Sequence, residues 1–124
     1  MNNKFKIFFL VGVLIIVLIG FMIKIPVPLR HHDKLLHGLF YFFASIFLYF
    51  FNKNNFINLL FLLIFGVFIE CMQHLSNKFT HSRIHGNFDI ADIYANCKGL
   101  IGYLICFSVV YSCNRIFRLI SVNK

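Results

Sequence analysis

The sequence predicts an all-α integral membrane protein with four transmembrane helices in an antiparallel bundle, forming one domain over residues 1–124. Three observations lead to this prediction. The chain is 60% hydrophobic and only 13% charged, whereas soluble domains are about half apolar and a quarter charged. A short chain still exposes much of its surface when folded, so this apolar excess needs lipid as its solvent. The apolar runs also lack the alternation of β-barrel spans, and helices satisfy their own backbone hydrogen bonds in lipid.

The first helix is expected at about residues 5–24, because residues 7–23 contain no charge. Its apolar part exceeds the ~7–15 residues of a signal-peptide core, and no Ala-x-Ala site follows, so we expect a retained helix. Pro26 and Pro28 then break the chain. The second helix is expected at about residues 34–51, and Asp33 before it is able to cap its first turn.

A short polar turn at residues 52–55 suits an antiparallel helix pair. The third helix is expected at about residues 56–75, followed by a polar loop to residue 87. The fourth helix is expected at about residues 90–113, with a basic tail behind it. Each run is close to the ~20 residues that span a bilayer.

The net charge of +8 points to anionic lipid head groups, because the basic residues lie between and beside the apolar runs rather than on a polar face. We therefore expect the lipid bilayer as partner, with an anionic envelope lipid or another membrane protein beside it, and no nucleic acid. Six basic residues fall on the side of the two termini and five on the other side. This bias favours cytoplasmic termini.

All four acidic side chains fall at one membrane face of the predicted bundle: Asp33, Glu70, Asp89 and Asp92. Helical spacing places other polar residues on the same faces as these carboxylates. His37 and Tyr41 follow Asp33 at i+4 and i+8 on the second helix. Gln73 and His74 follow Glu70 at i+3 and i+4 on the third helix, and Asn96 follows Asp92 at i+4 on the fourth. Polar groups are expensive in lipid, so these faces should turn inward and enclose one polar cavity, with Arg83 over it. The predicted binding residues are Asp33, Lys34, His37, Tyr41, Glu70, Gln73, His74, Arg83, Asp89, Asp92 and Asn96.

Structural roles are the alternative for each of these residues. The aspartates can cap helices or oppose the helix dipole, and Glu70 and His74 can make an interhelical hydrogen bond. Gly99 and Gly102 fit close packing better than ligand binding. No metal site is specified, although the candidate ligands are His37, Glu70, His74 and Asp92.

These residues resemble the pattern of the VanZ-like family of small bacterial membrane proteins over roughly residues 33–102. Asp33, Lys34, His37 and Tyr41 match its Asp-Lys-x-x-His-x-x-x-Tyr pattern. A second group matches the family's Glu-x-x-Gln pair, loop arginine and Asp-x-x-Asp-x-x-x-Asn-x-x-Gly-x-x-Gly segment: Glu70, Gln73, Arg83, Asp89, Asp92, Asn96, Gly99 and Gly102. The resemblance implies a multi-pass protein of the bacterial plasma membrane and cell envelope, linked to resistance to the glycopeptide antibiotic teicoplanin. It implies no particular reaction or cofactor.

Three functions are compatible with such a cavity. The first is binding of a polar or phosphate-bearing envelope ligand, such as a lipid head group, with the same surface also able to dock a membrane partner. The second is a membrane-embedded enzyme, dependent on a metal or on acid–base chemistry, that acts on a lipid-linked substrate. The third is an oligomeric ion or proton pathway. The sequence favours the first, because no catalytic motif is present.

Overall fold

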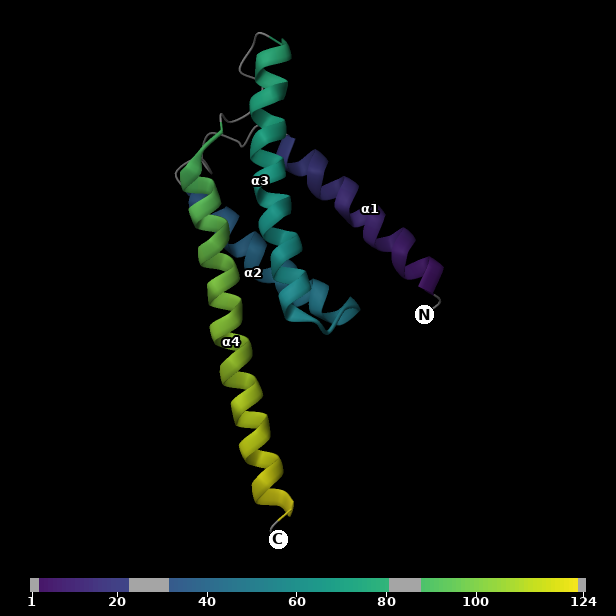
Figure 1. Cartoon of the computed structure of the whole chain (residues 1–124), viewed down its shortest axis with the longest axis vertical. Helices are drawn as coiled ribbons and strands as arrows, with labels where there is room; N and C mark the ends of the chain where they lie inside the picture. Colours follow the sequence, from purple (N-terminus) through teal and green to yellow (C-terminus); the bar gives the residue numbers. More distant parts are fainter. Residues whose placement is uncertain (1–2, 23–31, 81–87, 123–124) are drawn as a thin grey trace.

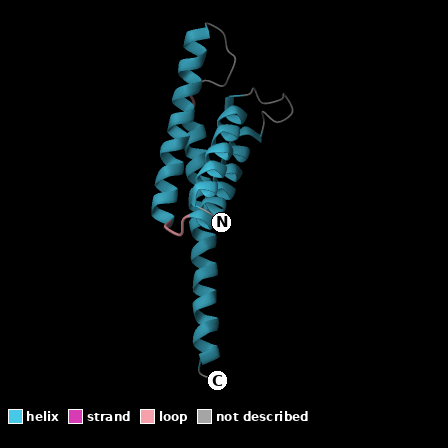
Figure 2. Ribbon diagram, turned by 90° about the vertical axis from the view of Figure 1, so that its right-hand side faces the viewer, coloured by secondary structure: helices cyan, strands magenta, loops and turns pink. Residues whose placement is uncertain are grey.

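The computed structural model describes residues 3–22, 32–80 and 88–122 of the chain. These residues form four α-helices: α1 (Asn3–Met22), α2 (Asp33–Phe51), α3 (Asn55–Thr80) and α4 (Ile90–Val122). The described part of the chain contains no strand (Figures 1 and 2). By length and composition, all four helices are able to cross a membrane. The all-α class with four helices is thus confirmed.

Two helices extend beyond their predicted ends. α3 continues to Thr80 rather than residue 75, and α4 continues to Val122 rather than residue 113. Polarity suggested loops at both places, yet neither extension contains glycine or proline to interrupt the helical backbone. The predicted loop after residue 75 is therefore wrong up to Thr80, and residues 81–87 lie outside the described part. The end of α4 projects beyond the other helices (Figures 1 and 2).

The two predicted aspartate caps have different outcomes. Asp89 precedes α4, and its Oδ1 accepts a hydrogen bond of 2.8 Å from the Ala91 backbone N–H. This is the geometry of an N-cap, which satisfies one of the free amides of the first turn. Asp33, in contrast, is the first residue of α2, and His32 before it makes no side-chain capping bond. Asp33 therefore does not occupy the N-cap position of α2, although its carboxylate lies in the first turn, where it opposes the helix dipole.

The packing of α2 against α4 is the most extensive contact between helices. It depends on two glycines, because a Cβ at Gly99 would run into the backbone of Gly38. Without a side chain at either position, the two helix backbones approach closely, as small residues allow in membrane helices. α3 packs on both α2 and α4.

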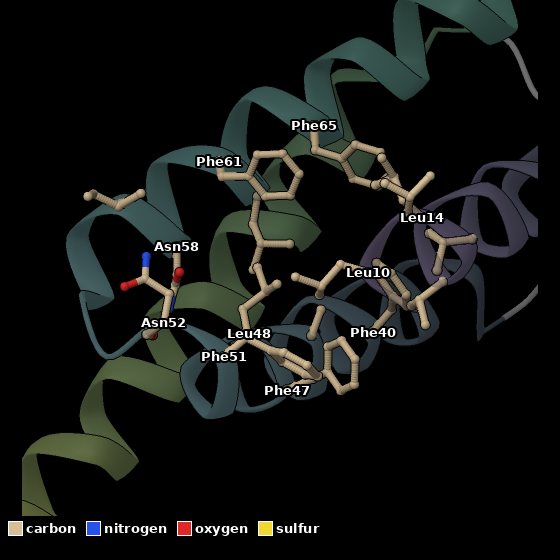
Figure 3. Close-up of a pocket in the computed structure, with 16 residues that line it drawn as sticks. Leu10, Leu14, Phe40, Phe47, Leu48, Phe51, Asn52, Asn58, Phe61 and Phe65 are labelled. Carbon is tan, nitrogen blue, oxygen red and sulfur yellow. The ribbon is translucent and has the colours of Figure 1, made fainter. Parts of the chain in front are cut away.

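α1 packs on α3, and aromatic side chains join it to α2. Phe9 contacts Phe47 and Phe51, and Phe21 contacts Phe40 with ring centroids 5.0 Å apart. The space left between α1, α2 and α3 is a cavity of about 360 Å³, shown in Figure 3. Its lining is apolar except for Asn52 and Asn58.

Candidate functional site: a buried polar cluster

Nine polar residues from α2, α3, α4 and the residue before α4 meet at one end of the helices. We refer to them as the polar cluster: Asp33, Lys34, His37, Tyr41, Glu70, Gln73, Asp89, Asp92 and Asn96. The members from α2 occupy its first turns, and those from α4 lie in its first two turns. Glu70 belongs to α3 about three turns before its end. Helical spacing predicted this meeting of three separate segments.

Lys34 forms the outer edge of the polar cluster. Its ammonium group pairs with Asp89 Oδ2 at 2.5 Å and also with Asp92 Oδ1. The Lys34 and Asp89 side chains are about half exposed, whereas the Asp92 side chain is 9% exposed. The hydrogen bond from Lys34 and the backbone bond from Ala91 hold the pKa of Asp89 below its ordinary value of 3.8. Asp89 therefore stays charged and keeps α2 tied to α4.

His37 lies one turn deeper and is held by α4. Its Nδ1 lies 3.0 Å from the side-chain oxygen of Asn96. An amide oxygen only accepts hydrogen bonds, so Nδ1 carries the proton. The other ring nitrogen, Nε2, lies 3.7 Å from Asp33 Oδ1. The ring of Phe21 from α1 packs against the imidazole, with centroids 5.3 Å apart.

Glu70 is the deepest charged group, with no exposed surface. Its Oε2 accepts a hydrogen bond of 3.1 Å from the Asp89 backbone N–H, which ties α3 to the start of α4. Its Oε1 has no hydrogen-bond partner among the described residues, and the same is true of Tyr41 Oη and Asp33 Oδ1. Unpaired buried polar atoms are rare in folded proteins, and each requires an explanation.

Gly66 makes the space in which the Tyr41 hydroxyl lies. A Cβ at Gly66 would be 2.8 Å from Tyr41 Oη and 2.9 Å from Asn96 Nδ2. The absence of a side chain on α3 therefore lets polar groups of α2 and α4 reach the middle of the bundle. On the same helix, Gln73 donates a 2.8 Å hydrogen bond to the Phe21 backbone oxygen of α1, so α1 is attached to the cluster as well.

The charges of the polar cluster are unequal. It contains four carboxylates and one lysine, and Lys34 pairs with only two of the carboxylates. Asp33 faces His37, which offers a charge only when protonated. Glu70 has no ion-pair partner among the described residues. A buried carboxylate is stable only when it is paired, hydrogen-bonded or protonated, so this arrangement favours a further cation or proton at the cluster.

Two predicted binding residues are not brought into the cluster by the described structure. His74 is exposed, although Glu70 and Gln73 beside it are buried. Arg83 lies outside the described residues. Gly38 and Gly66 were not singled out from the sequence. The signal that could have found Gly66 is its position one turn before Glu70 on the same apolar helix.

Comparison of the chain with protein-family models, with curated proteins and with solved structures found no match.

Proposed function

We propose that the chain is a multi-pass protein of the bacterial plasma membrane that binds the polar head group of an envelope lipid at the polar cluster. One observation carries the proposal: Glu70 is fully buried at the base of the cluster, and its Oε1 has no partner among the described residues. A helical protein that needed only packing at this position would keep an apolar residue, since lone polar groups inside membrane proteins are expensive and usually functional. Asp33 Oδ1 and Tyr41 Oη are two further buried atoms that have no hydrogen-bond partner in the part of the chain that the structure describes.

The position of the cluster suits a ligand that enters from the membrane interface. Lys34 and Asp89 are about half exposed at the helix ends, Asp92 and His37 are buried, and Glu70 has no exposed surface. A head group entering between the helices would first meet the Lys34 ammonium, which is a point charge suited to phosphate. The carboxylates behind it suit an amine or a metal cation.

The apolar cavity favours a lipid over a water-soluble ligand. Phe40 lines this cavity and contacts Phe21, whose ring in turn packs on His37 of the cluster. Polar and apolar binding surfaces therefore lie next to each other along α1 and α2. A cavity of about 360 Å³ is within the usual range for small-molecule sites, about 300–1,000 Å³.

The resemblance to the VanZ-like family supports an envelope role, including a link to teicoplanin resistance. With alternating helix directions, the two termini lie on one side and the polar cluster opens on the other. The distribution of basic residues favours cytoplasmic termini, so we place the cluster on the outer side of the membrane. A fluorescent reporter that matures only in the cytoplasm, fused after Lys124, should be bright. A dark reporter together with an active periplasmic phosphatase fusion would reverse the orientation.

Native mass spectrometry of the chain released from its own membrane in mild detergent tests the binding proposal. We expect a retained adduct that is lost in Glu70→Gln, which keeps an acceptor for Asp89 but removes the charge. The matched control is His74→Gln, since His74 is exposed one turn further along the same helix. Equal adducts in both variants, or only bulk lipid in the wild type, would refute the proposal.

A second candidate function is acid–base catalysis on a lipid-linked substrate. The observation that favours it is the environment of His37, whose Nδ1 is held by Asn96 while Nε2 faces Asp33. A neutral imidazole with one oriented nitrogen is suited to accept a proton. Turnover of extracted lipid-linked precursors, lost in His37→Gln and kept in His74→Gln, would support this candidate. No turnover in the wild type across pH 5–8 would exclude it.

A further inference from the structure

A divalent cation site fits at the junction of α2 and α4. One ligand atom each from Asp33, His37 and Asp92 lies within 4.8 Å of the others. His37 and Asp92 are both 7% exposed and the Asp33 side chain is 29% exposed, so two of the three groups are buried and the third is partly buried. A histidine nitrogen with two carboxylate oxygens is a donor set that transition-metal ions accept.

The spacing of these atoms is close to that of a coordination sphere. Bonds of about 2.0–2.2 Å to nitrogen and oxygen place two ligand atoms roughly 3.0–4.2 Å apart around one ion, depending on the angle. His37 Nε2 and Asp33 Oδ1 are 3.7 Å apart. Only small side-chain rotations are therefore needed for both to contact one ion.

The hydrogen bond to Asn96 selects the tautomer of His37 that can bind a metal through Nε2. Because Asn96 fixes the proton on Nδ1, the lone pair of the neutral ring is on Nε2, which is the nitrogen that faces Asp33. Metal-binding histidines commonly donate their second ring N–H to an oxygen in this way. Asp33 Oδ1 itself is buried and has no hydrogen-bond partner among the described residues.

The fully buried carboxylate next to this group is an independent indication of a cation. Glu70 has no exposed surface, and within the described part of the chain its Oε1 has no hydrogen-bond partner. Glu70 also interacts electrostatically with Asp92 and His37. Lys34 supplies one positive charge to Asp89 and Asp92, which leaves Asp33 and Glu70 uncompensated among the described residues.

We propose that Asp33, His37 and Asp92 bind one divalent transition-metal ion of the Mn²⁺ or Zn²⁺ class, with Asn96 orienting the histidine. The inference builds on the proposed function, because a bound cation is what would let an acidic cluster hold a phosphate-bearing head group. Lys34 then acts as a competitor for Asp92, and its half-exposed side chain is free to turn outward when the ion binds.

The test is equilibrium binding of Mn²⁺ to the full chain in detergent micelles, followed by electron paramagnetic resonance. We expect one saturable ion per chain, with a ¹⁴N coupling from the imidazole that disappears in His37→Gln. Asp33→Asn should abolish saturable binding. Asn96→Ala should weaken it by about 10–100-fold, as loss of an orienting partner typically does. His74→Gln is the control and should bind as the wild type does.

Replacement of Lys34 distinguishes a metal site from a purely structural ion pair. Lys34→Met removes a competing positive charge, so Mn²⁺ affinity should rise even if the fold becomes less stable. No saturable Mn²⁺ or Zn²⁺ in the wild type would overturn the inference, as would a nitrogen coupling that persists in His37→Gln. Lipid retention is measured separately by mass. Lipid held without a metal would refute this inference alone, and a metal held without lipid would refute the proposed function alone.

Discussion

Replacing Gly99 by alanine tests whether the close approach of α2 and α4 holds the polar cluster together. A Cβ at this position would lie 3.0 Å from the carbonyl carbon and 3.2 Å from the Cα of Gly38, with the carbonyl oxygen nearer still. Ordinary contacts of a Cβ begin at about 3.4 Å. Backbone atoms of a helix cannot rotate away as a side chain can, so the two helices must separate.

The expected loss follows from overpacking and from the position of the glycine. Forcing an extra methyl group into a packed interface lowers the free energy of unfolding by about 1–3 kcal/mol. His37 precedes Gly38 directly, and Asn96 lies one turn before Gly99. Their side chains are 3.0 Å apart, and a hydrogen bond stretched to about 3.6 Å is lost. Ligand binding at the cluster should therefore weaken together with stability.

Unfolding of the purified chain by titration with a denaturing detergent measures the effect. Gly102→Ala is the matched control on the same helix, because its Cβ would meet only a Phe42 ring carbon at 3.6 Å. Gly20→Ala is a second control, because no atom of the described residues lies within 4 Å of a Cβ at Gly20. Both controls should be as stable as the wild type or up to about 1 kcal/mol more stable, since alanine favours helix. Equal stability of Gly99→Ala and Gly102→Ala would refute the reasoning.

Three further tests give distinct outcomes. Glu70→Gln should raise the free energy of unfolding or leave it unchanged, because it removes a buried charge that has no ion-pair partner among the described residues. Titration with a denaturing detergent measures this change, and a loss above about 2 kcal/mol would contradict the prediction. The wild type should be more stable than Asp89→Asn near neutral pH. This difference should vanish as the pH falls through the lowered pKa of Asp89, below 3.8, because protonation ends the pairing with Lys34. Unfolding curves between pH 6 and 3 measure the difference, and a difference in free energy of unfolding that stayed constant would contradict the prediction. Ala44 lines the apolar cavity, so Ala44→Leu should change the free energy of unfolding by less than about 1 kcal/mol. Ala95 lies at the α2–α4 interface, so Ala95→Leu should lower the free energy of unfolding by about 1–3 kcal/mol. Equal losses in the two variants would show that the cavity has no room for the larger side chain.

The sequence predicted the four helices because length and apolarity alone decide which segments suit lipid. It also grouped Asp33, His37 and Tyr41 correctly on one face of α2, all of which are intermediate or buried in the structure. This prediction succeeded because polar groups within an apolar helix have few inexpensive positions other than the bundle interior. The helix ends were less predictable, since polar residues beyond the apolar stretch remain helical when no glycine or proline interrupts them.

His74 shows where spacing alone was insufficient. Buried residues of α3 recur along the whole helix: Asn58, Leu62, Phe65, Gly66, Ile69, Glu70 and Gln73. At roughly 100° per residue, their mean direction lies on the Gln73 side of Glu70, and His74 is more than about 100° away from it. The i, i+4 relation to Glu70 placed His74 near the edge of that face, and the packing of α3 on α2 and α4 left it outside.

The sequence also did not predict which residues of different helices contact one another. Gly38 and Gly99 are 61 residues apart in the chain numbering, and nothing local shows that they face one another. The pairing of Lys34 with both Asp89 and Asp92 similarly depends on the rotation of α2 against α4. Without that geometry, the sequence suggested His37, Glu70, His74 and Asp92 as metal ligands. Among the described residues, the atoms close enough to share an ion belong to Asp33, His37 and Asp92.

A crystal structure of the wild-type chain grown from a lipidic mesophase would test the central claim most directly. The claim is that the polar cluster binds a ligand that completes its unpaired groups. We predict non-protein density within about 3.2 Å of Glu70 Oε1 or Asp33 Oδ1, the range of a hydrogen bond or a metal bond. If both oxygens were instead bonded to the guanidinium of Arg83 or to another protein group, with no additional density, the cluster would be a structural network and the binding function would be contradicted.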